Sequence, residues 1–120
     1  MARWLIVDDD IRFTETLTEV LLKNGFDVGV AYWGSDALES LDDNFDGVLV
    51  DLNLTDIDGD EVIEKIRQRF PNIKLGLITG IPEVELKELA QKCRADFYLR
   101  KPFEIKKLIQ IMRQVEKQEV

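Results

Sequence analysis

The sequence predicts an α/β fold in which five parallel strands alternate with five helices that cover both faces of the sheet. Three observations predict it. Short strand-like segments recur five times, a segment with helical spacing of apolar residues follows each of them, and most of the strand segments are continuous apolar runs. A continuous apolar run is typical of a parallel strand buried on both faces. Right-handed crossovers would then build a doubly wound (βα)5 sheet.

The predicted strands are short and end in polar residues or turns. They are WLIV (4–7), DVGVAY (27–32), GVLVDL (47–52), KLGLIT (74–79) and DFYL (96–99). Four of them are uninterrupted apolar runs rather than alternating patterns, which favours strands with both faces covered.

Apolar residues between the strands are spaced as on one face of a helix. Shorter helices fit residues 35–43 and 60–70. The longer helical faces contain Phe13, Leu17, Val20 and Leu21 in the first, Leu86, Leu89, Ala90 and Cys93 in the fourth, and Leu108, Ile111, Met112 and Val115 in the last. This spacing predicts amphipathic helices packed on the sheet.

Polar residues and glycines mark where the helices begin and end. Asp10 is placed to cap the first helix, and Gly25 to close it. Asp58 and Gly59 lead into the third helix, where Glu61 is placed for a capping box. The first and third helices therefore have residues suited to capping at their predicted ends.

Length and composition indicate one globular domain over residues 1–120. The chain is 45% hydrophobic and 33% charged, an ordinary balance for a protein with a buried core. No apolar run reaches membrane-spanning length and no signal-peptide pattern opens the chain, so no membrane association is expected. Cys93 is the single cysteine, which excludes an internal disulfide and favours a cytoplasmic protein.

The charge balance and the missing histidine exclude several function classes. Sixteen Lys and Arg against 24 Asp and Glu give a net charge of −8 without a basic stripe, which argues against direct nucleic acid binding. Without histidine there is no imidazole metal ligand, histidine general base or Ser-His triad. The chemistry left is that of carboxylates, hydroxyls, lysine and backbone.

Polar residues follow four of the predicted strands at the same end. Asp8 and Asp9 follow the first strand, Asp51 ends the third, Thr79 ends the fourth and Lys101 follows the fifth. Singly, each has an ordinary interpretation as a cap, a turn residue or a surface charge. Ligands gather at the carboxyl ends of parallel strands, where these side chains would meet.

Neighbouring carboxylates at one edge of the sheet predict a site for a hard cation. Mg²⁺ prefers oxygen ligands and is commonly held by one or two carboxylates, and it would relieve their mutual repulsion. A cation, a lysine and a hydroxyl around a carboxylate suit phosphoryl transfer, in which the carboxylate itself accepts the group.

The motifs "LIVDDD", "VLVDLNL", "LITG" and "YLRKPF", in this order over nearly the whole chain, resemble the receiver domain of two-component response regulators. The resemblance implies a flavodoxin-like fold with strand order 2-1-3-4-5. It implies phosphorylation of Asp51. Asp9 and Asp51 would bind Mg²⁺ directly, Asp8 through water, and Asn53 through its backbone carbonyl.

The resemblance also implies how the site would work as a switch. Lys101 would pair with the phosphoryl group, and its peptide bond to Pro102 would be cis. Thr79 would hydrogen-bond the phosphoryl group, and Tyr98 would turn inward when Thr79 moves. The surface of the fourth helix, fifth strand and fifth helix would then change its partner preference. Ile81 stands at a position that influences access of water, and it predicts slow self-dephosphorylation.

The expected partners follow from the same resemblance. A chain without histidine needs a phosphoryl donor from outside, either a sensor histidine kinase, a phosphotransfer protein or a small phosphodonor. The output would be a separate protein or a C-terminal output domain beyond this chain, with phosphorylation-dependent homodimerisation as a further option. Such a domain would not be an enzyme beyond catalysing its own phosphorylation and slow dephosphorylation.

Three residues depart from the common pattern of these domains. Thr55 stands where proline is frequent, Arg94 replaces a glycine before the fifth strand, and Trp33 occupies a loop position that is usually small or polar. None of them belongs to the acid cluster.

Two short motifs and one alternative role suggest other interpretations. "DLNLT" (51–55) resembles the D-x-D-x-T signature of haloacid-dehalogenase-type phosphohydrolases, but Asn53 replaces its second aspartate. "DIDGDE" (56–61) suggests a calcium loop, but Glu61 replaces the needed glycine and Arg67 the bidentate acid. A degenerate receiver that serves only as a docking module remains open.

Overall fold

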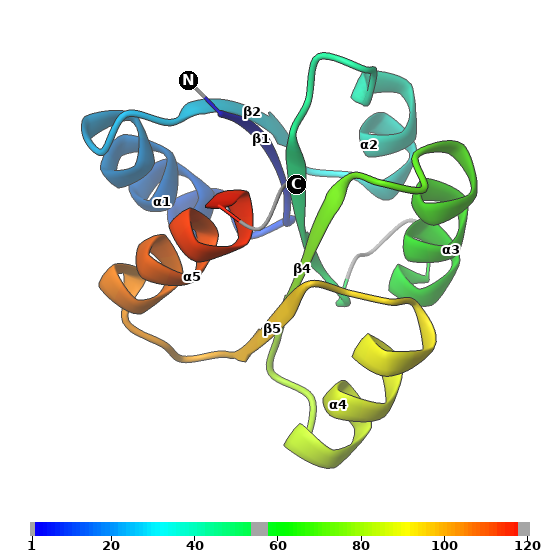
Figure 1. The fold of residues 1–120 in the computed structure, drawn as a ribbon. Helices are drawn as coiled ribbons and strands as arrows, with labels where there is room; N and C mark the ends of the chain where they lie inside the picture. Colours follow the sequence, from blue (N-terminus) through cyan, green and yellow to red (C-terminus); the bar gives the residue numbers. More distant parts are fainter. Residues whose placement is uncertain (1, 54–57, 118–120) are drawn as a thin grey trace.

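The computed structural model describes residues 2–53 and 58–117, in which strands and helices alternate five times (Figure 1). The strands are β1 (Arg3–Val7), β2 (Asp27–Ala31), β3 (Gly47–Asp51), β4 (Lys74–Thr79) and β5 (Phe97–Arg100). The helices are α1 (Ile11–Lys23), α2 (Gly34–Ser40), α3 (Gly59–Arg69), α4 (Glu83–Lys92) and α5 (Ile105–Lys117).

The five strands form one parallel sheet in the order β2-β1-β3-β4-β5. The predicted doubly wound α/β fold and its strand order are therefore confirmed. Because all strands run the same way, their carboxyl ends lie along one edge of the sheet, and residues that directly follow the strands are brought together there.

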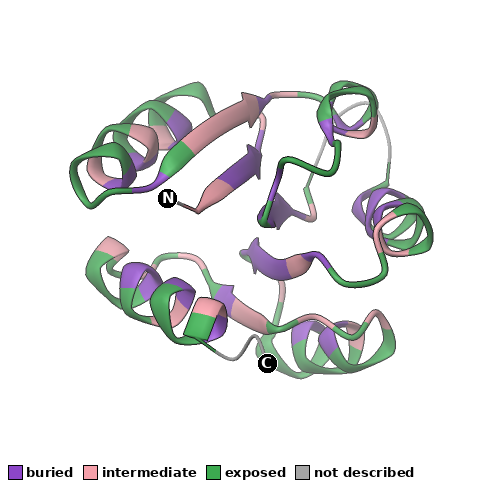
Figure 2. Cartoon of the chain, turned by 45° about the horizontal axis from the view of Figure 1, so that its top comes forward, coloured by how far each residue is buried: buried purple, intermediate pink, exposed green. Residues whose placement is uncertain are grey.

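Helices cover both faces of the sheet, with α1 and α5 on one face and α2, α3 and α4 on the other (Figure 1). Successive residues of β1 divide between the two layers, as the pleat of a strand requires. Trp4 and Ile6 pack with α1 and α5, whereas Leu5 and Val7 pack with the opposite layer. All four are buried, and Figure 2 shows the buried positions along the central strands and the inner faces of the helices.

Glycine in β3 makes room for the largest side chain of the core. A Cβ atom on Gly47 would lie 2.6 Å from the ring of Trp4, closer than real contacts allow. Trp4 is fully buried, and its indole nitrogen donates a hydrogen bond to Glu116 Oε1 at 2.9 Å. The last turn of α5 is thus bonded to the first strand of the sheet.

The helix termini largely follow the predicted signals. The Asp10 carboxylate accepts a hydrogen bond from the Phe13 backbone nitrogen at 3.1 Å and caps α1. Gly25 follows α1 with φ +88°, a left-handed conformation that glycine adopts without strain. Asp58 caps α3 through the Asp60 nitrogen at 3.2 Å. Glu61, predicted to complete a capping box, pairs with Lys65 at 3.0 Å.

The second helix is shorter than predicted. We expected residues 35–43, but α2 ends at Ser40 and Leu41 has an extended backbone (φ −69°, ψ 132°). Leu41 is buried, so its apolar side chain continued the helical pattern although its backbone does not. The Asp42 carboxylate accepts a hydrogen bond from the Asn44 nitrogen at 2.9 Å, a local turn that competes with the helix.

Among the residues that the structure describes, no helix has the length and apolarity needed to cross a membrane.

Candidate functional site

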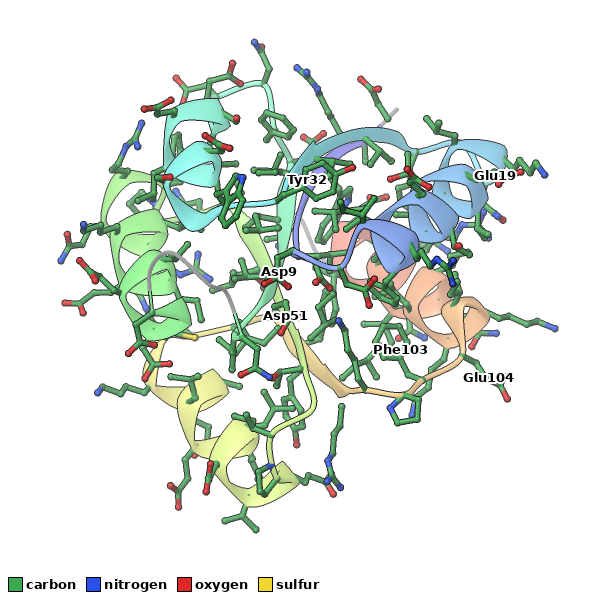
Figure 3. The ribbon with its side chains drawn as sticks, turned by 180° about the vertical axis from the view of Figure 1, so that it is seen from behind. Asp9, Glu19, Tyr32, Asp51, Phe103 and Glu104 are labelled. Carbon is green, nitrogen blue, oxygen red and sulfur yellow. The ribbon has the colours of Figure 1, made fainter. Side chains whose placement is uncertain are left out.

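Three carboxylates converge at the carboxyl ends of β1 and β3. These strands are paired neighbours, with Val7 opposite Val50, so the residues after them lie side by side. One carboxylate oxygen from each of Asp8, Asp9 and Asp51 lies within 4.8 Å of the other two. Figure 3, which labels Asp9 and Asp51, shows them close together beyond the strand ends. The structure therefore places these predicted site residues in one cluster.

Asp8 is the fully buried member of this cluster. Its carboxylate accepts hydrogen bonds from Lys101 Nζ at 2.7 Å and from the Asp10 backbone nitrogen at 3.0 Å. Burial raises the pKa of Asp8 to about 6, because a charged carboxylate loses its hydration, and the neighbouring Asp51 adds to this rise. The two hydrogen bonds oppose the rise without cancelling it.

Lys101 follows β5 and lies between two carboxylates from different strands. Its ammonium nitrogen is 2.7 Å from Asp8 Oδ2 and 3.0 Å from Asp51 Oδ2. It also lies 4.2 Å from the centre of the Phe13 ring. Burial alone would lower the pKa of Lys101, but the hydrogen bonds and charges of the two carboxylates outweigh burial and raise it. Lys101 is therefore a cation held at the acid cluster.

Asp51 is fixed through both of its carboxylate oxygens. Oδ2 accepts from Lys101, and Oδ1 accepts a hydrogen bond from the backbone nitrogen of Asn53 at 3.0 Å. The chain on this side is tightly packed, since a Cβ atom on Gly59 would lie 2.6 Å from the backbone of Leu52. Gly59 thus allows the first turn of α3 to approach the residue that follows Asp51.

Thr79 lies at the end of β4, buried beside the Lys101 backbone. Its carbonyl oxygen accepts a hydrogen bond from the Lys101 nitrogen at 2.7 Å. Its hydroxyl oxygen accepts from the Ile81 nitrogen at 3.4 Å. The Lys101–Pro102 peptide bond is cis. β4 and β5 thereby deliver a hydroxyl and an ammonium group to the edge that holds the carboxylates.

Tyr98 lies in β5, before Lys101 in the sequence. It is half-buried and packs against the layer of α2, α3 and α4. Together with Glu83 and Phe103 it lines a cavity of about 650 Å³ at the exposed edge of the sheet. Tyr98 therefore borders the surface of α4, β5 and α5.

The donor set of the acid cluster fits a divalent oxygen-binding cation. All three side chains offer carboxylate oxygens, the ligand type that Mg²⁺ and similar ions prefer. Three carboxylates and one ammonium group leave an excess of about two negative charges when Asp8 is ionised. A doubly charged ion would neutralise that excess.

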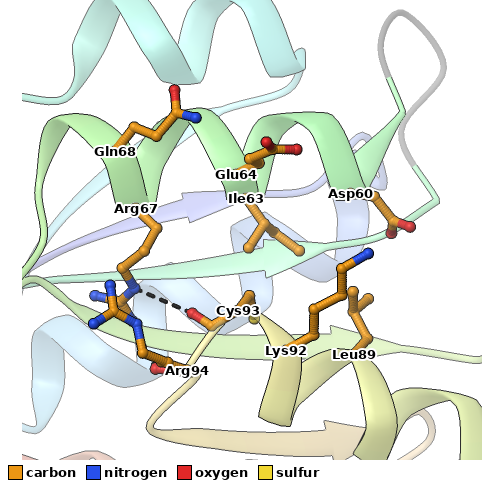
Figure 4. Close-up of a pocket in the computed structure, with 9 residues that line it drawn as sticks. All are labelled: Asp60, Ile63, Glu64, Arg67, Gln68, Leu89, Lys92, Cys93 and Arg94. Carbon is orange, nitrogen blue, oxygen red and sulfur yellow. Dashed lines mark hydrogen bonds between the residues drawn. The ribbon is translucent and has the colours of Figure 1, made fainter.

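A second concave region lies between α3 and α4, apart from the predicted site residues (Figure 4). It has a volume of about 440 Å³ and is lined by Asp60, Ile63, Glu64, Arg67, Gln68, Leu89, Lys92, Cys93 and Arg94. In the sequence, Arg67 is notable only because it stands where a calcium loop would need an acidic ligand. Its contacts could not be predicted from the sequence, because its partners lie in loops that only the fold brings together.

Arg67 binds backbone carbonyl groups from two separate loops. Nε donates to Cys93 at 3.2 Å, and Nη2 donates to Arg94 at 2.9 Å. Nη1 donates to Pro71 at 3.0 Å and to Ile73 at 2.9 Å. The guanidinium group therefore joins the α3–β4 loop to the α4–β5 loop.

The model of the response regulator receiver domain matches residues 4–113.

Of the phosphohydrolase signature at 51–55, residues 54 and 55 lie outside the described residues. So does the start of the rejected calcium loop at 56 and 57. Thr55, one of the departures noted in the sequence, lies outside them as well.

Curated proteins of similar sequence are named as transcriptional regulatory proteins. The chain is 36% identical over 109 residues to a transcriptional regulatory protein CpxR homolog from Haemophilus influenzae, covering 91% of this chain and 48% of the relative. It is 34% identical to CpxR from Escherichia coli, covering 96% and 49%. The chain thus spans about half the length of these curated relatives.

Solved structures agree over the whole fold. A CheY-like receiver domain protein from Methanospirillum hungatei superposes with a TM-score of 0.89 at 28% identity, covering 98% of this chain and 96% of that one. The non-phosphorylated HemR receiver domain from Leptospira biflexa gives 0.93 at 26% identity, covering 100% and 98%. Together with the family match and the clustered acids, these likenesses show that the chain belongs to the receiver domains of two-component response regulators.

Proposed function

We propose that this chain is a phosphoacceptor switch in which Asp51 receives a phosphoryl group. The observation that carries the proposal is the position of Lys101, whose ammonium group contacts both Asp8 and Asp51. A cation beside the acceptor carboxylate can follow the charge that develops on the phosphoryl oxygens during transfer. We include all of residues 1–120 in this phosphoacceptor domain.

In the transfer, an oxygen of the Asp51 carboxylate forms the new bond to phosphorus. The bond between phosphorus and the donor breaks, and its electron pair stays with the donor. For a phosphohistidine donor the leaving atom is an imidazole nitrogen, and for acetyl phosphate it is an acetate oxygen. The product is a mixed anhydride on Asp51, and no oxidant or reductant is needed.

The clustered carboxylates would hold Mg²⁺. Asp9 and Asp51 would bind it directly, Asp8 through water, and Asn53 through its backbone carbonyl; the oxygen donors and the excess negative charge support this assignment. When bound, the ion would neutralise charge on the carboxylates and on the phosphoryl oxygens. Lys101 is a further cation that contacts both Asp8 and Asp51.

The switch would start from Thr79 and reach the surface of α4, β5 and α5. The Thr79 hydroxyl would hydrogen-bond the phosphoryl group, and Tyr98 would turn inward in response. Tyr98 is half-buried beside a cavity of about 650 Å³, which supports a rotation at this position. A few kcal/mol of difference in phosphoryl contacts between two conformations is enough to shift such an equilibrium.

Partners belong to the same proposal. A sensor histidine kinase or a phosphotransfer protein would donate the phosphoryl group, because the chain contains no histidine of its own. The output would be a separate protein or a C-terminal output domain, and the phosphorylated form would be able to pair with a second copy. We expect a cytoplasmic switch that binds neither nucleic acid nor membrane and is not an enzyme beyond its own phosphorylation and dephosphorylation.

The direct test is the intact mass of the purified protein after incubation with acetyl phosphate and Mg²⁺. We expect one added phosphoryl group. The addition should require Mg²⁺ and should be absent from the matched variant Asp51→Asn, which keeps the size of the side chain but removes its nucleophilic charge. A folded protein that gains no phosphoryl group would instead support a docking module that works without phosphorylation.

Ile81 leads to a prediction about the lifetime of the phosphorylated form. The residue is half-buried, and its backbone nitrogen donates a hydrogen bond to the Thr79 hydroxyl, the group that would bond the phosphoryl group. We expect slow self-dephosphorylation, and we expect Ile81→Asn to shorten the lifetime about tenfold by helping to position water. The decay of the phosphorylated mass after removal of the donor measures this. Loss of the phosphoryl group within seconds in the unaltered protein would contradict it.

A further inference from the structure

Within the part of the chain that the structure describes, the ammonium group of Lys101 contacts two carboxylates and one aromatic ring. An ammonium group carries three hydrogens. Asp8 and Asp51 accept at 2.7 and 3.0 Å, and the ring of Phe13 lies 4.2 Å from the nitrogen. The Phe13 ring is therefore the third neighbour of the Lys101 ammonium group, on which the proposed transfer depends.

A ring at this distance attracts a cation through its quadrupole, which an aliphatic side chain of similar size lacks. The attraction is stronger where water is largely excluded, and the Lys101 side chain is 23% exposed. Phe13 differs here from the other apolar residues of α1. Its apolar character was visible in the sequence, but its electrostatic contact was not.

A second aromatic residue supports the ring. Phe103, two residues after Lys101, lies with its ring centre 6.0 Å from that of Phe13, and the two planes meet at 88°. An edge-to-face arrangement of this kind is a favoured geometry for aromatic pairs. It fixes the orientation of Phe13 from the same loop that carries the lysine.

We propose that Phe13 is a positioning residue for phosphoryl transfer: its ring holds the Lys101 ammonium group within reach of Asp51, and Phe103 keeps the ring oriented. The inference rests on the proposed function, since it concerns how quickly Asp51 accepts a phosphoryl group. Phe13 acts only through Lys101. It neither contacts the phosphoryl group nor supplies a proton.

The test compares Phe13→Leu with Phe13→Tyr. Leucine keeps an apolar side chain but has no ring, whereas tyrosine keeps the ring. With acetyl phosphate at several concentrations and Mg²⁺ at saturation, we expect Phe13→Leu to lower the maximal phosphorylation rate about tenfold. The concentration of donor that gives half the maximal rate should change little. Phe13→Tyr should keep most of the maximal phosphorylation rate of the unaltered protein.

Val20→Ala is the control for a merely structural effect. Val20 lies on the same helix, is half-buried and packs in the same layer, so its truncation should lower thermal stability. We expect the rate of folded Val20→Ala to match that of the unaltered protein. An unchanged rate in Phe13→Leu, an equal loss in Val20→Ala, or no recovery in Phe13→Tyr would each overturn the proposal.

Proton NMR of the Lys101 ε-methylene group separates this inference from the proposed function. A ring beside the ammonium group should shift these protons upfield in the unaltered protein and in Phe13→Tyr, but not in Phe13→Leu. If Asp51 accepts no phosphoryl group, the proposed function fails, and the shift still shows whether Phe13 holds Lys101. The same lysine shifts in Phe13→Leu and the unaltered protein would overturn the inference directly.

Discussion

Lys101 and Arg67 are both partly buried cations, and they are used in different ways. Arg67 belongs to α3, and its side chain donates to four backbone carbonyl groups in the two loops at the amino ends of β4 and β5. Lys101 lies at the carboxyl ends of the strands and contacts two carboxylates. Arg67 thus donates its hydrogen bonds to neutral carbonyl groups, whereas Lys101 binds carboxylates, which can also bind protons and metals.

This difference would separate a contact that stabilises the fold from one that serves the proposed phosphoryl transfer. The carbonyl groups around Arg67 cannot change charge, and Asp96 at 4.0 Å balances the guanidinium group. Lys101 contacts two members of a cluster of three carboxylates, so its single positive charge leaves an excess of negative charge there. Buried charge without a fixed partner is costly, and it persists where a ligand completes it. The comparison predicts that altering the two cations will affect different measurable properties.

The largest expected effect is on activity, from Lys101→Met. Removal of the cation beside the acceptor carboxylate should lower the phosphorylation rate about a hundredfold or more, a loss typical of charge-stabilising groups in active sites. The rate of mass gain with acetyl phosphate measures it. Lys106→Met, an exposed lysine of α5, is the control and should leave the rate unchanged. A rate within a few-fold of normal in Lys101→Met would contradict the role given to Lys101.

Arg67→Met should reverse this pattern. Loss of four hydrogen bonds from a charged donor should lower the free energy of unfolding by about 2 to 3 kcal/mol, since water can reach some of the freed carbonyl groups. Urea unfolding measures this loss.

The folded Arg67→Met protein should still accept a phosphoryl group at the normal rate. Arg67→Lys should lie between the two in stability, because lysine keeps the charge but not the planar set of donors. Normal stability in Arg67→Met would remove the contrast between the two cations.

The pH should affect the acid cluster through Asp8, whose pKa is raised to about 6. A metal site requires deprotonated carboxylates, so protonation of Asp8 competes with Mg²⁺. Lowering the pH from 7 to 5 should weaken Mg²⁺ binding about tenfold by this route. Titration calorimetry measures the affinity, and Asp8→Asn should remove this part of the pH dependence.

Stability should change in the opposite direction in the metal-free protein. The pKa of Asp8 is higher in the folded chain than its ordinary value of 3.8, so the folded chain binds this proton more tightly than the unfolded chain does. This group therefore adds stability as the pH falls from about 6 towards 3.8. Weaker Mg²⁺ binding without this gain would place the titrating group elsewhere.

The smallest expected effect concerns Arg94, which has φ +57° and follows Cys93, the residue that caps the end of α4. A left-handed conformation is unfavourable for a residue with a Cβ atom but not for glycine, so Arg94→Gly should stabilise the protein by about 1 kcal/mol. Thermal unfolding measures the change. The same replacement at Lys92, the last residue of α4, should destabilise instead.

Most of the fold was predictable because each strand and helix has a local signal. The apolar runs marked all five strands to within a residue, and Asp10 and Gly25 marked the ends of α1. The strand order came from the resemblance. The end of α2 was predicted three residues too late. Leu41 lies just after the helix with an extended backbone, but its side chain is buried, so in the sequence it fits the apolar spacing of a helix.

The acids of the candidate site were predictable because they follow adjacent strands of a parallel sheet. The contacts of Phe13 and Arg67 were not. Phe13 had the spacing of an ordinary core residue, and only the path of the chain after β5 brings Lys101 to its ring. Arg67 binds carbonyl groups of residues 71, 73, 93 and 94, and backbone groups leave no trace in the side-chain pattern.

The hydrogen bond from the Trp4 indole to Glu116 joins positions 112 residues apart in the sequence. Its two partners lie in β1 and α5, so it forms only when the last helix is packed against the first strand. Trp4 is fully buried, whereas Trp33 is 48% exposed. The indole proton of Trp4 should therefore exchange with solvent deuterium only when the whole molecule unfolds. Its exchange rate would then report the free energy of global unfolding.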